Sequence, residues 1–258
     1  MNVVVCVKQI PDPNSPGKLD PQTKRLVREG VDLVVDPGDE HAVEAGVQLI
    51  EKHGGEVTLI SMGPPKAADV FRKPLAMGAH RGVLITDPAL ENADALSTAR
   101  AIAAAIKDRS YDLVICGTES TDGSSGAVPA QLAEILGLPL LSFAKKLEVS
   151  DGKAVIDRQT DEGYDVVEAP LPAVVTVTGG INEARYPALR GIMQAKNKEV
   201  KQVSVKDLGL DGKVGKAALT QEVVDVVPAE ARKAGEVVED KGEGGKRIAD
   251  FLQQLKVI

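Results

Sequence analysis

Aromatic side chains are scarce in this sequence, and tryptophan is absent. Aromatics make up 2% of the chain, whereas hydrophobic residues make up 43%. The core must therefore be built from Val, Leu, Ile and Ala, which is typical of a parallel α/β sheet rather than a β-sandwich. So few rings also leave little to stack against single-stranded bases.

An excess of basic charge is missing too, since the formal net charge is −7. A protein that binds duplex nucleic acid is usually basic, so we expect no nucleic-acid partner. The sequence contains no apolar run of the ~20 residues that span a bilayer. Its start, MNVVVCVKQIPD, lacks the basic region and cleavage site of a leader peptide. We therefore expect a cytoplasmic protein that does not insert into membranes.

Cysteine and histidine are rare and scattered. Cys6 and Cys116 each lie within an apolar run, which predicts buried free thiols and a reducing compartment; a disulfide between neighbouring strands is the alternative. CxxC motifs and Cys/His clusters are absent, which argues against a metal site. No histidine lies beside a Ser or Cys nucleophile, and the glycine motifs of dehydrogenases and P-loop ATPases are missing. We therefore predict no catalytic residues.

The first half of the chain alternates between two hydrophobic patterns. Continuous apolar runs predict buried strands at 3–7, 57–62, 83–86 and 113–116. Amphipathic periodicity predicts helices at 39–52, 66–77, 92–107 and 126–136. This alternation predicts a Rossmann-like α/β fold, with an open, mainly parallel sheet and helices on both faces. Pro74 should kink the second helix.

The pattern changes in the middle of the chain. Residues 144–160 read as a hairpin with Asp151-Gly152 at the turn. Two further strands follow at 164–168 and 173–178, and we expect them to extend the sheet antiparallel at one edge. Residues 1–195 are thus predicted to form one α/β domain that includes this edge extension.

Residues 196–258 are predicted to form a C-terminal arm. The stretch 196–246 is rich in Lys, Asp, Glu and Gly and contains several short elements at most. Residues 246–256 form an amphipathic helix that is too short to be stable alone in water. We expect this helix to dock on a partner subunit; the alternative is that it folds back on its own domain.

Polar and glycine-rich segments follow the predicted strands. Ligands of open parallel sheets bind at the carboxyl ends of the strands, where strand order reverses. The run 117–125, GTESTDGSS, is the strongest phosphate candidate, because Gly123 to Gly126 can turn backbone N–H groups toward an anion at a helix start. Its lack of lysine suits a monophosphate, or a nucleotide that is not hydrolysed, better than catalysis on a triphosphate. The alternative is an ordinary loop with Ser124 or Ser125 as N-cap.

Seven segments together resemble the β subunit of electron-transfer flavoproteins over nearly the full length of the chain. They are VVVCVKQIPD, DPGDEHAVEAG, LISMGP, RKPLAMGAHRG, TDGSSGAVPAQLAEILGLP, LPAVVTVT and INEARYPALRGIMQAK. The last, at 181–196, is the most specific, because generic α/β proteins do not carry it.

The resemblance implies a heterodimer with an electron-transfer flavoprotein α subunit and an FAD shared with that subunit. It also implies a structural AMP in this chain. Electrons would pass from acyl-CoA or other dehydrogenases, as in fatty acid oxidation, to a quinone reductase or another acceptor. The implied nucleotide contacts are Cys6, Asp36, Pro37, Gly38, Asp39, Met62, Asp122, Gly123, Ser124, Ser125, Gly126, Ala127 and Val128.

The resemblance also implies a loop that docks partner dehydrogenases. Leu189 corresponds to the anchor leucine, and an exposed Leu can fill an apolar pocket on a partner. Nearby Arg185, Arg190 and Lys196 could steer an acidic partner. The implied partner-binding residues are Tyr186, Leu189, Ile192 and Met193.

Two alternatives stay open. Asp122-Gly123, Val128 and Thr98 also resemble family members that bind a second FAD in place of AMP, oxidise NADH and bifurcate electrons, although Ala95 replaces a threonine expected there. The other alternative is a stand-alone adenine-nucleotide-binding protein of the universal-stress type.

Overall fold

The computed structural model describes residues 1–107, 110–227, 235 and 237–258. The chain divides into two compact units, Met1–Val223 and Val224–Ile258. The first contains all the strands described here, and the second contains helix α6 (Gly244–Gln254). Residues 196–223, which we expected to begin the arm, belong to the first unit.

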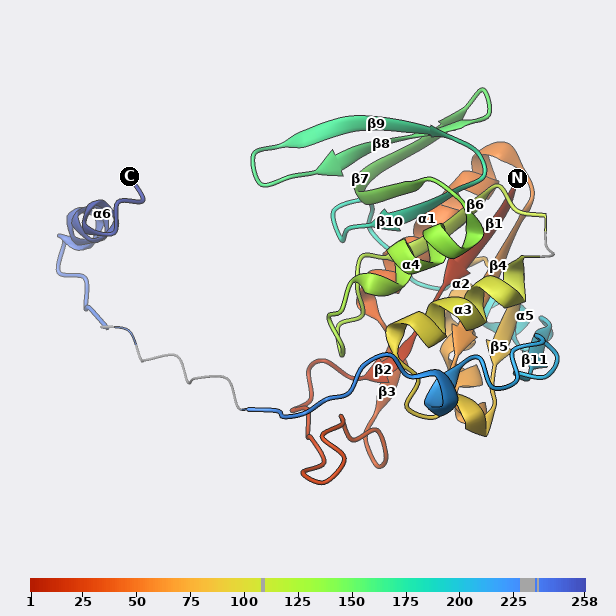
Figure 1. Cartoon of the computed structure of the whole chain (residues 1–258). Coiled ribbons are helices and arrows are strands. Elements are labelled where there is room, and N and C mark those ends of the chain that lie inside the picture. Colours follow the sequence, from red (N-terminus) through yellow and green to blue (C-terminus); the bar gives the residue numbers. More distant parts are fainter. Residues whose placement is uncertain (108–109, 228–234, 236) are drawn as a thin grey trace. The chain divides into compact units, whose positions relative to one another are not determined.

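Nine strands of the described residues form one large sheet in the order β11-β5-β4-β1-β6-β10-β7-β8-β9 (Figure 1). Its pairs are parallel from β11 to β7 and antiparallel from β7 to β9. The predicted parallel sheet with an antiparallel edge is confirmed. The strands are β1 (Asn2–Cys6), β4 (Glu56–Met62), β5 (Arg81–Ile85), β6 (Leu113–Gly117), β7 (Leu140–Ser150), β8 (Lys153–Gln159), β9 (Tyr164–Pro170), β10 (Ala173–Val177) and β11 (Val200–Val203).

Our expectation for residues 173–178 is wrong. Strand β10 does not extend the antiparallel edge; it lies between β6 and β7 and is parallel to both. Every residue of β10 is buried, as expected for a strand covered on both faces. Strand β11, which we did not predict, pairs with β5 at the opposite edge of the sheet.

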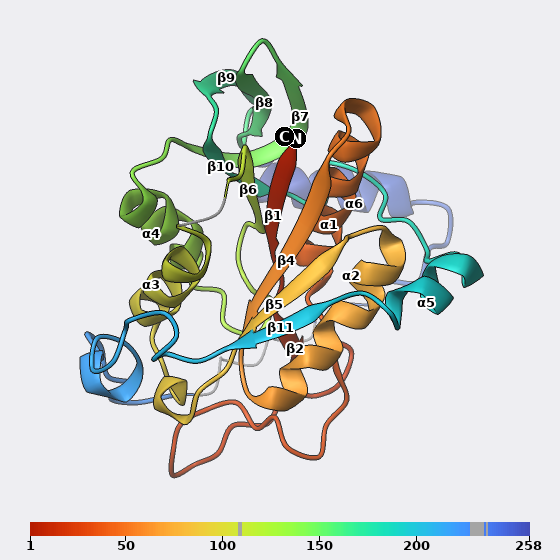
Figure 2. The ribbon, with the colours of Figure 1, turned by 90° about the vertical axis from the view of Figure 1, so that its right-hand side faces the viewer.

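Helices cover both faces of the sheet, as predicted (Figure 2). Helices α1 (Pro37–His53) and α2 (Arg72–Met77) lie on one side, and α3 (Ala95–Ile106) and α4 (Ala127–Leu136) on the other. Strand β1 shows why both faces are apolar: Val3 and Val5 belong to one core cluster, and Val4 belongs to the other.

Smaller elements complete the first unit. Strands β2 (Gln9–Pro11) and β3 (Leu33–Val35) form a separate antiparallel pair. The predicted helix at 66–77 is a 3₁₀ segment, η1 (Pro65–Phe71), followed by α2. Pro74 lies in the first turn of α2, just after the 3₁₀ segment ends. The other elements are η2 (Pro88–Leu90), α5 (Leu189–Ala195) and η3 (Gly215–Ala218).

The chain after β11 is fastened to the start of α3. Asp94, the N-cap of α3, accepts a hydrogen bond from Ser97 N–H at 2.8 Å. Its other carboxylate oxygen accepts from the N–H and the hydroxyl of Thr220, both at 2.8 Å. Burial opposes ionisation, but these bonds outweigh it and lower the pKa of Asp94 to about 2. Thr220 is therefore held in place by a charged group.

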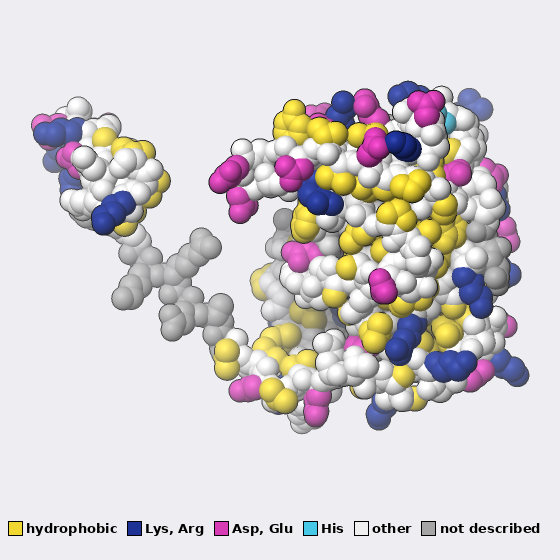
Figure 3. All heavy atoms as spheres, turned by 45° about the horizontal axis from the view of Figure 1, so that its top comes forward, with side chains coloured by type: hydrophobic (Ala, Val, Ile, Leu, Met, Phe, Trp, Pro, Cys, Tyr) yellow, Lys and Arg dark blue, Asp and Glu magenta, His cyan; other side chains and the backbone are white. Residues whose placement is uncertain are grey.

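Helix α6 is amphipathic, as predicted. Ile248 and Phe251 are exposed in it, as is Leu255 directly after it, and its apolar and charged side chains gather on different sides (Figure 3). Docking of α6 on a partner stays a prediction. No helix in the described residues is long and apolar enough to cross a bilayer.

Candidate functional site

The strand order reverses between β1 and β6. The chain builds β4 and β5 on one side of β1 and then returns to place β6 on its other side. Cys6 ends β1, Gly117 ends β6, and α1 begins nearby at Pro37. This edge is where open α/β sheets bind ligands, and we use the word crevice as a name for the region around Cys6, Gly117 and Pro37.

Asp36 joins two walls of the crevice. It is fully buried and caps α1 by accepting from Gly38 N–H at 3.0 Å. It also accepts from the N–H and hydroxyl of Thr121, at 2.7 and 3.0 Å. Pro37 follows at the first helical position, where proline is favoured. The loop after β6 is thereby tied to the start of α1.

Asp39 is a buried carboxyl group beside Asp36. It accepts from Lys8 N–H at 2.7 Å, and a Cβ on Gly117 would lie only 2.9 Å from its Oδ1. Burial, reinforced by the nearby Asp36, raises the pKa of Asp39 to about 8. The group is therefore mostly protonated at neutral pH and can donate as well as accept a hydrogen bond.

Two cations reach the loop after β6. Lys8 Nζ donates to Ser120 Oγ at 3.0 Å and to Asp122 Oδ1 at 2.6 Å. Arg28, from the segment between β2 and β3, pairs with the other oxygen of Asp122. Burial opposes ionisation of Asp122, but the bonds from Lys8 and Arg28 keep its pKa below the ordinary value. The loop that lacks lysine in sequence thus has lysine and arginine beside it.

The end of this loop leaves the start of α4 without a side-chain cap. Ser124 and Gly126 both have positive φ, 44° and 58°, and Gly126 directly precedes the helix. In the described structure neither Ser124 nor Ser125 caps α4, so the capped-loop alternative does not hold. The N–H groups of Ala127 and Val128 begin a helix whose dipole favours an anion there.

Both cysteines are free thiols. Cys6 and Cys116 contact each other, and this contact together with burial raises the pKa of the Cys116 thiol. Met62 ends β4 at the same edge and packs, like Cys6, against the core that includes Cys116. Gly63 follows; a Cβ there would lie 2.8 Å from Ala67 Cβ, so packing alone requires this glycine.

A second set of site residues is exposed around α5. Tyr186 is 93% exposed, Leu189 75% and Met193 64%, and Ile192 is also exposed. Leu189, Ile192 and Met193 are spaced to share one face of α5. Three of the four implied partner-binding residues thus share a face of α5, and the fourth, Tyr186, precedes the helix. We call residues 181–195 the docking segment.

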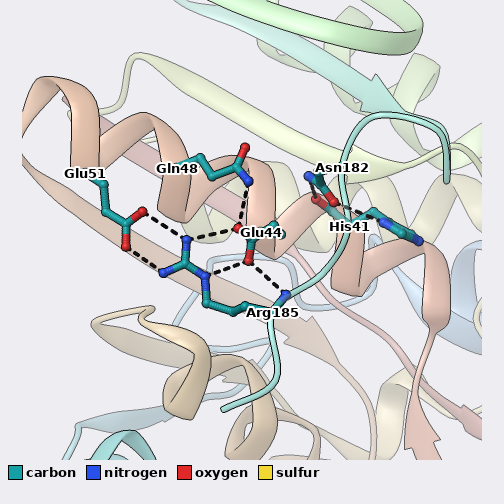
Figure 4. Close-up of polar contacts among 6 residues, drawn as sticks. All are labelled: His41, Glu44, Gln48, Glu51, Asn182 and Arg185. Carbon is teal, nitrogen blue, oxygen red and sulfur yellow. Dashed lines mark hydrogen bonds and ion pairs between the residues drawn. The ribbon is translucent and has the colours of Figure 1, made fainter. Parts of the chain in front are cut away.

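We expected Arg185 to be available to steer an acidic partner, but its charge is paired within the chain. Its guanidinium group is bound to Glu44 and Glu51 of α1 (Figure 4). Steering by Arg190 and Lys196 stays a prediction.

Comparisons with known proteins agree with these features. An electron transfer flavoprotein domain model matches residues 23–208. The chain is 42% identical over 264 residues to the electron transfer flavoprotein subunit beta of Mycobacterium bovis, covering 100% of this chain and 99% of that protein. The chain belongs to the electron transfer flavoprotein β-subunit family. This assignment confirms the resemblance seen in the sequence and supports a role in electron transport rather than a stand-alone stress-type protein.

Two further relatives have different names. The electron transfer flavoprotein subunit beta of Thermoanaerobacterium thermosaccharolyticum is 39% identical over 239 residues, covering 92% of each chain. Subunit CarD of the caffeyl-CoA reductase–Etf complex of Acetobacterium woodii is 37% identical over 212 residues, covering 81% of this chain and 80% of that protein.

Lys8 was noted in the sequence only as part of the segment that ends the first strand, and Arg28 was not noted at all. Lys8 directly follows the predicted strand, so its position at the edge could have been inferred. Arg28 could not, because it lies in a segment without periodicity. The described residues contain no cluster of three or more His, Cys, Asp or Glu side chains able to hold a metal.

Proposed function

We propose that this chain is the β subunit of a heterodimeric electron-transfer flavoprotein working in the cytoplasm. It shares an FAD with an α subunit, accepts electrons from acyl-CoA or other dehydrogenases, and passes them to a quinone reductase or another acceptor. The bound flavin supplies the redox chemistry. The residues of this chain bind and orient the flavin and exclude water from it. The chain is thus proposed to be a carrier and not an enzyme by itself.

We further propose that the crevice holds the phosphate of an AMP. Two observations carry this proposal: Lys8 and Arg28 both pair with Asp122, and α4, which begins at Ala127 later in the same loop, has no side-chain cap. Two cations and a helix start together favour an anion. Asp122 is the anion that now pairs with both cations, and a phosphate could share them.

The remaining crevice residues suit the nucleoside. Protonated Asp39 can donate a hydrogen bond to an acceptor on the base or ribose. Met62 and Cys6 offer apolar surface at the ends of their strands. Asp36 keeps α1 and the loop after β6 together, so the walls are formed before a ligand binds.

The test is the nucleotide content of the complex formed by co-expression with the α subunit. Denaturation, extraction and chromatographic quantitation should release one FAD and one AMP per heterodimer. A complex with neither AMP nor a second dinucleotide would contradict the crevice assignment. Failure of the chain to associate with a flavin-bearing α subunit would contradict the heterodimer.

A second candidate is an electron-bifurcating subunit that binds another FAD in the crevice. The similarity to subunit CarD favours it, because that relative belongs to a caffeyl-CoA reductase–Etf complex. Two flavins per heterodimer, no AMP and oxidation of NADH by the complex would decide for this alternative.

The docking segment is proposed to bind the electron-donating dehydrogenase. Leu189 is the most exposed apolar residue of α5, and an apolar side chain in such a position can insert into a partner pocket. The apolar side of α6 is proposed to bind the α subunit.

A further inference from the structure

One guanidinium group fastens the docking segment to α1. Arg185 Nε and Nη2 donate to the two oxygens of Glu44 at 2.7 and 2.9 Å. Arg185 Nη1 and Nη2 also donate to the two oxygens of Glu51, at 2.6 and 2.9 Å (Figure 4). Bidentate pairs of this kind fix orientation as well as charge.

Neighbouring polar contacts extend this attachment. The N–H of Arg185 donates to Glu44 Oε2 at 3.2 Å, and Gln48 Nε2 donates to Glu44 Oε1 at 2.8 Å. Asn182 Nδ2 donates to the carbonyl of His41 at 3.0 Å, and its Oδ1 lies 3.0 Å from His41 Nδ1. Their spacing places the α1 residues on one stripe of the helix: His41, Glu44, Gln48 and Glu51.

The carboxylate of Glu44 depends on Arg185. Its side chain is only 3% exposed. Burial opposes ionisation, but the hydrogen bonds from Arg185 outweigh it and hold the pKa of Glu44 below its ordinary value. A buried carboxylate that loses its cation is strongly destabilised, so α1 and residue 185 are coupled.

The far end of the same segment is fastened to α2. A Cβ on Gly191 would lie 2.3 Å from the carbonyl oxygen of Ala76, so α5 and α2 approach as closely as their backbones allow. Lys198 Nζ donates to the carbonyls of Leu75 and Ala79 at 2.9 and 2.6 Å. The exposed apolar residues of α5 therefore lie between two attachment points.

We propose that Arg185 is a positioning residue, which holds residues 181–195 in the conformation that docks the electron-donating dehydrogenase. This inference rests on the docking role proposed above. A segment that is already ordered avoids the cost of ordering on association. Because its hydrogen bonds run inward to α1, Arg185 acts by geometry rather than by attracting the partner.

The test compares Arg185→Gln with Arg190→Gln in the complex with the α subunit. Arg190 is an exposed cation of the same segment, and no ion pair of its side chain occurs in the described part of the chain. Amide hydrogen exchange would be measured over residues 181–195. Steady-state electron transfer would be measured with an acyl-CoA dehydrogenase from the same organism as donor, at low and high salt.

Arg185→Gln should speed exchange over residues 181–195 and raise the KM for the dehydrogenase about tenfold, which corresponds to about 1.4 kcal/mol. The kcat should be unchanged, and the ratio of variant to parent KM should be the same at both salt concentrations. Arg190→Gln should leave exchange unchanged. Arg185→Lys keeps the charge but loses the forked guanidinium group. Its exchange rate and its KM should lie between those of the parent and those of Arg185→Gln.

Unchanged exchange in Arg185→Gln, or faster exchange with an unchanged KM, would overturn the positioning role. If Arg185→Gln fails to assemble with flavin, Glu51→Gln gives the same comparison with a smaller rise in KM. Leu189→Ala separates the two proposals: an unchanged KM in that variant removes the docking role, while the exchange data still show whether Arg185 fastens the segment.

Discussion

The buried carboxylate of Asp36 accepts a hydrogen bond from Thr121 N–H at 2.7 Å, so the residue that caps α1 also holds the loop after β6. Asp36→Ala removes the cap and leaves buried donors unpaired. The free energy of unfolding should fall by about 2–4 kcal/mol. Urea unfolding of the complex at fixed protein concentration would measure it. Asp161→Ala, at an exposed position, should have little effect; equal losses in the two variants would refute this role of Asp36.

Loss of Lys8 should weaken binding of a phosphate more than binding of a nucleoside. Lys8→Gln removes one of the two cations beside Asp122, and AMP affinity should fall about tenfold. Titration calorimetry on nucleotide-depleted complex, with adenosine as the uncharged comparison, would measure the change. Lys18→Gln, on the same exposed segment as Arg28, is the matched control. Equal losses for AMP and adenosine would place Lys8 away from the phosphate.

Asp39 should make stability depend on pH. Its pKa is raised from the ordinary 3.8 to about 8 in the folded chain, so between about pH 4 and pH 8 the folded state binds more protons than the unfolded state. The stability contributed by this group is therefore full below pH 4 and is lost as pH rises to 8. Asp39→Asn stays neutral, so its melting temperature relative to the parent should increase from pH 5 to pH 8. A constant difference across this range would argue against a protonated Asp39.

Leu189→Ala should impair docking without disturbing the cofactors. Truncating a hot-spot side chain costs about 2 kcal/mol, or roughly thirtyfold in the KM for the dehydrogenase. Flavin content should stay at the parent value. Ile135→Ala removes an exposed apolar side chain from α4 and should leave KM unchanged. Equal rates for Leu189→Ala and the parent would remove Leu189 from the interface.

Local patterns predicted most of the sheet because buried parallel strands are continuous apolar runs. Strands β1, β4, β5 and β6 lie within one or two residues of their predicted positions. The turn was equally clear: Asp151 and Gly152 both have positive φ, as a tight hairpin requires. Periodicity also placed α1, α3 and α4.

Pairing partners and long-range ion pairs were not visible in the sequence. The run AVVTV shows that β10 is buried, but it does not show that β10 lies between β6 and β7. Strand β11 was missed because VKQV contains only one buried residue. Arg185 looked like a solvated cation because its partner Glu44 is 141 positions away in the chain.

The hydrogen bonds between Asp94 and Thr220 fix the point at which the C-terminal residues leave the first unit. The second unit begins only a few residues later, at Val224. On the proposal that α6 binds the α subunit, the number of residues between Thr220 and α6 sets the effective concentration at which the two chains form their remaining contacts. Loss of the Asp94 bonds would release residues 220–223 as well, and so lengthen the chain between its last fixed point and α6.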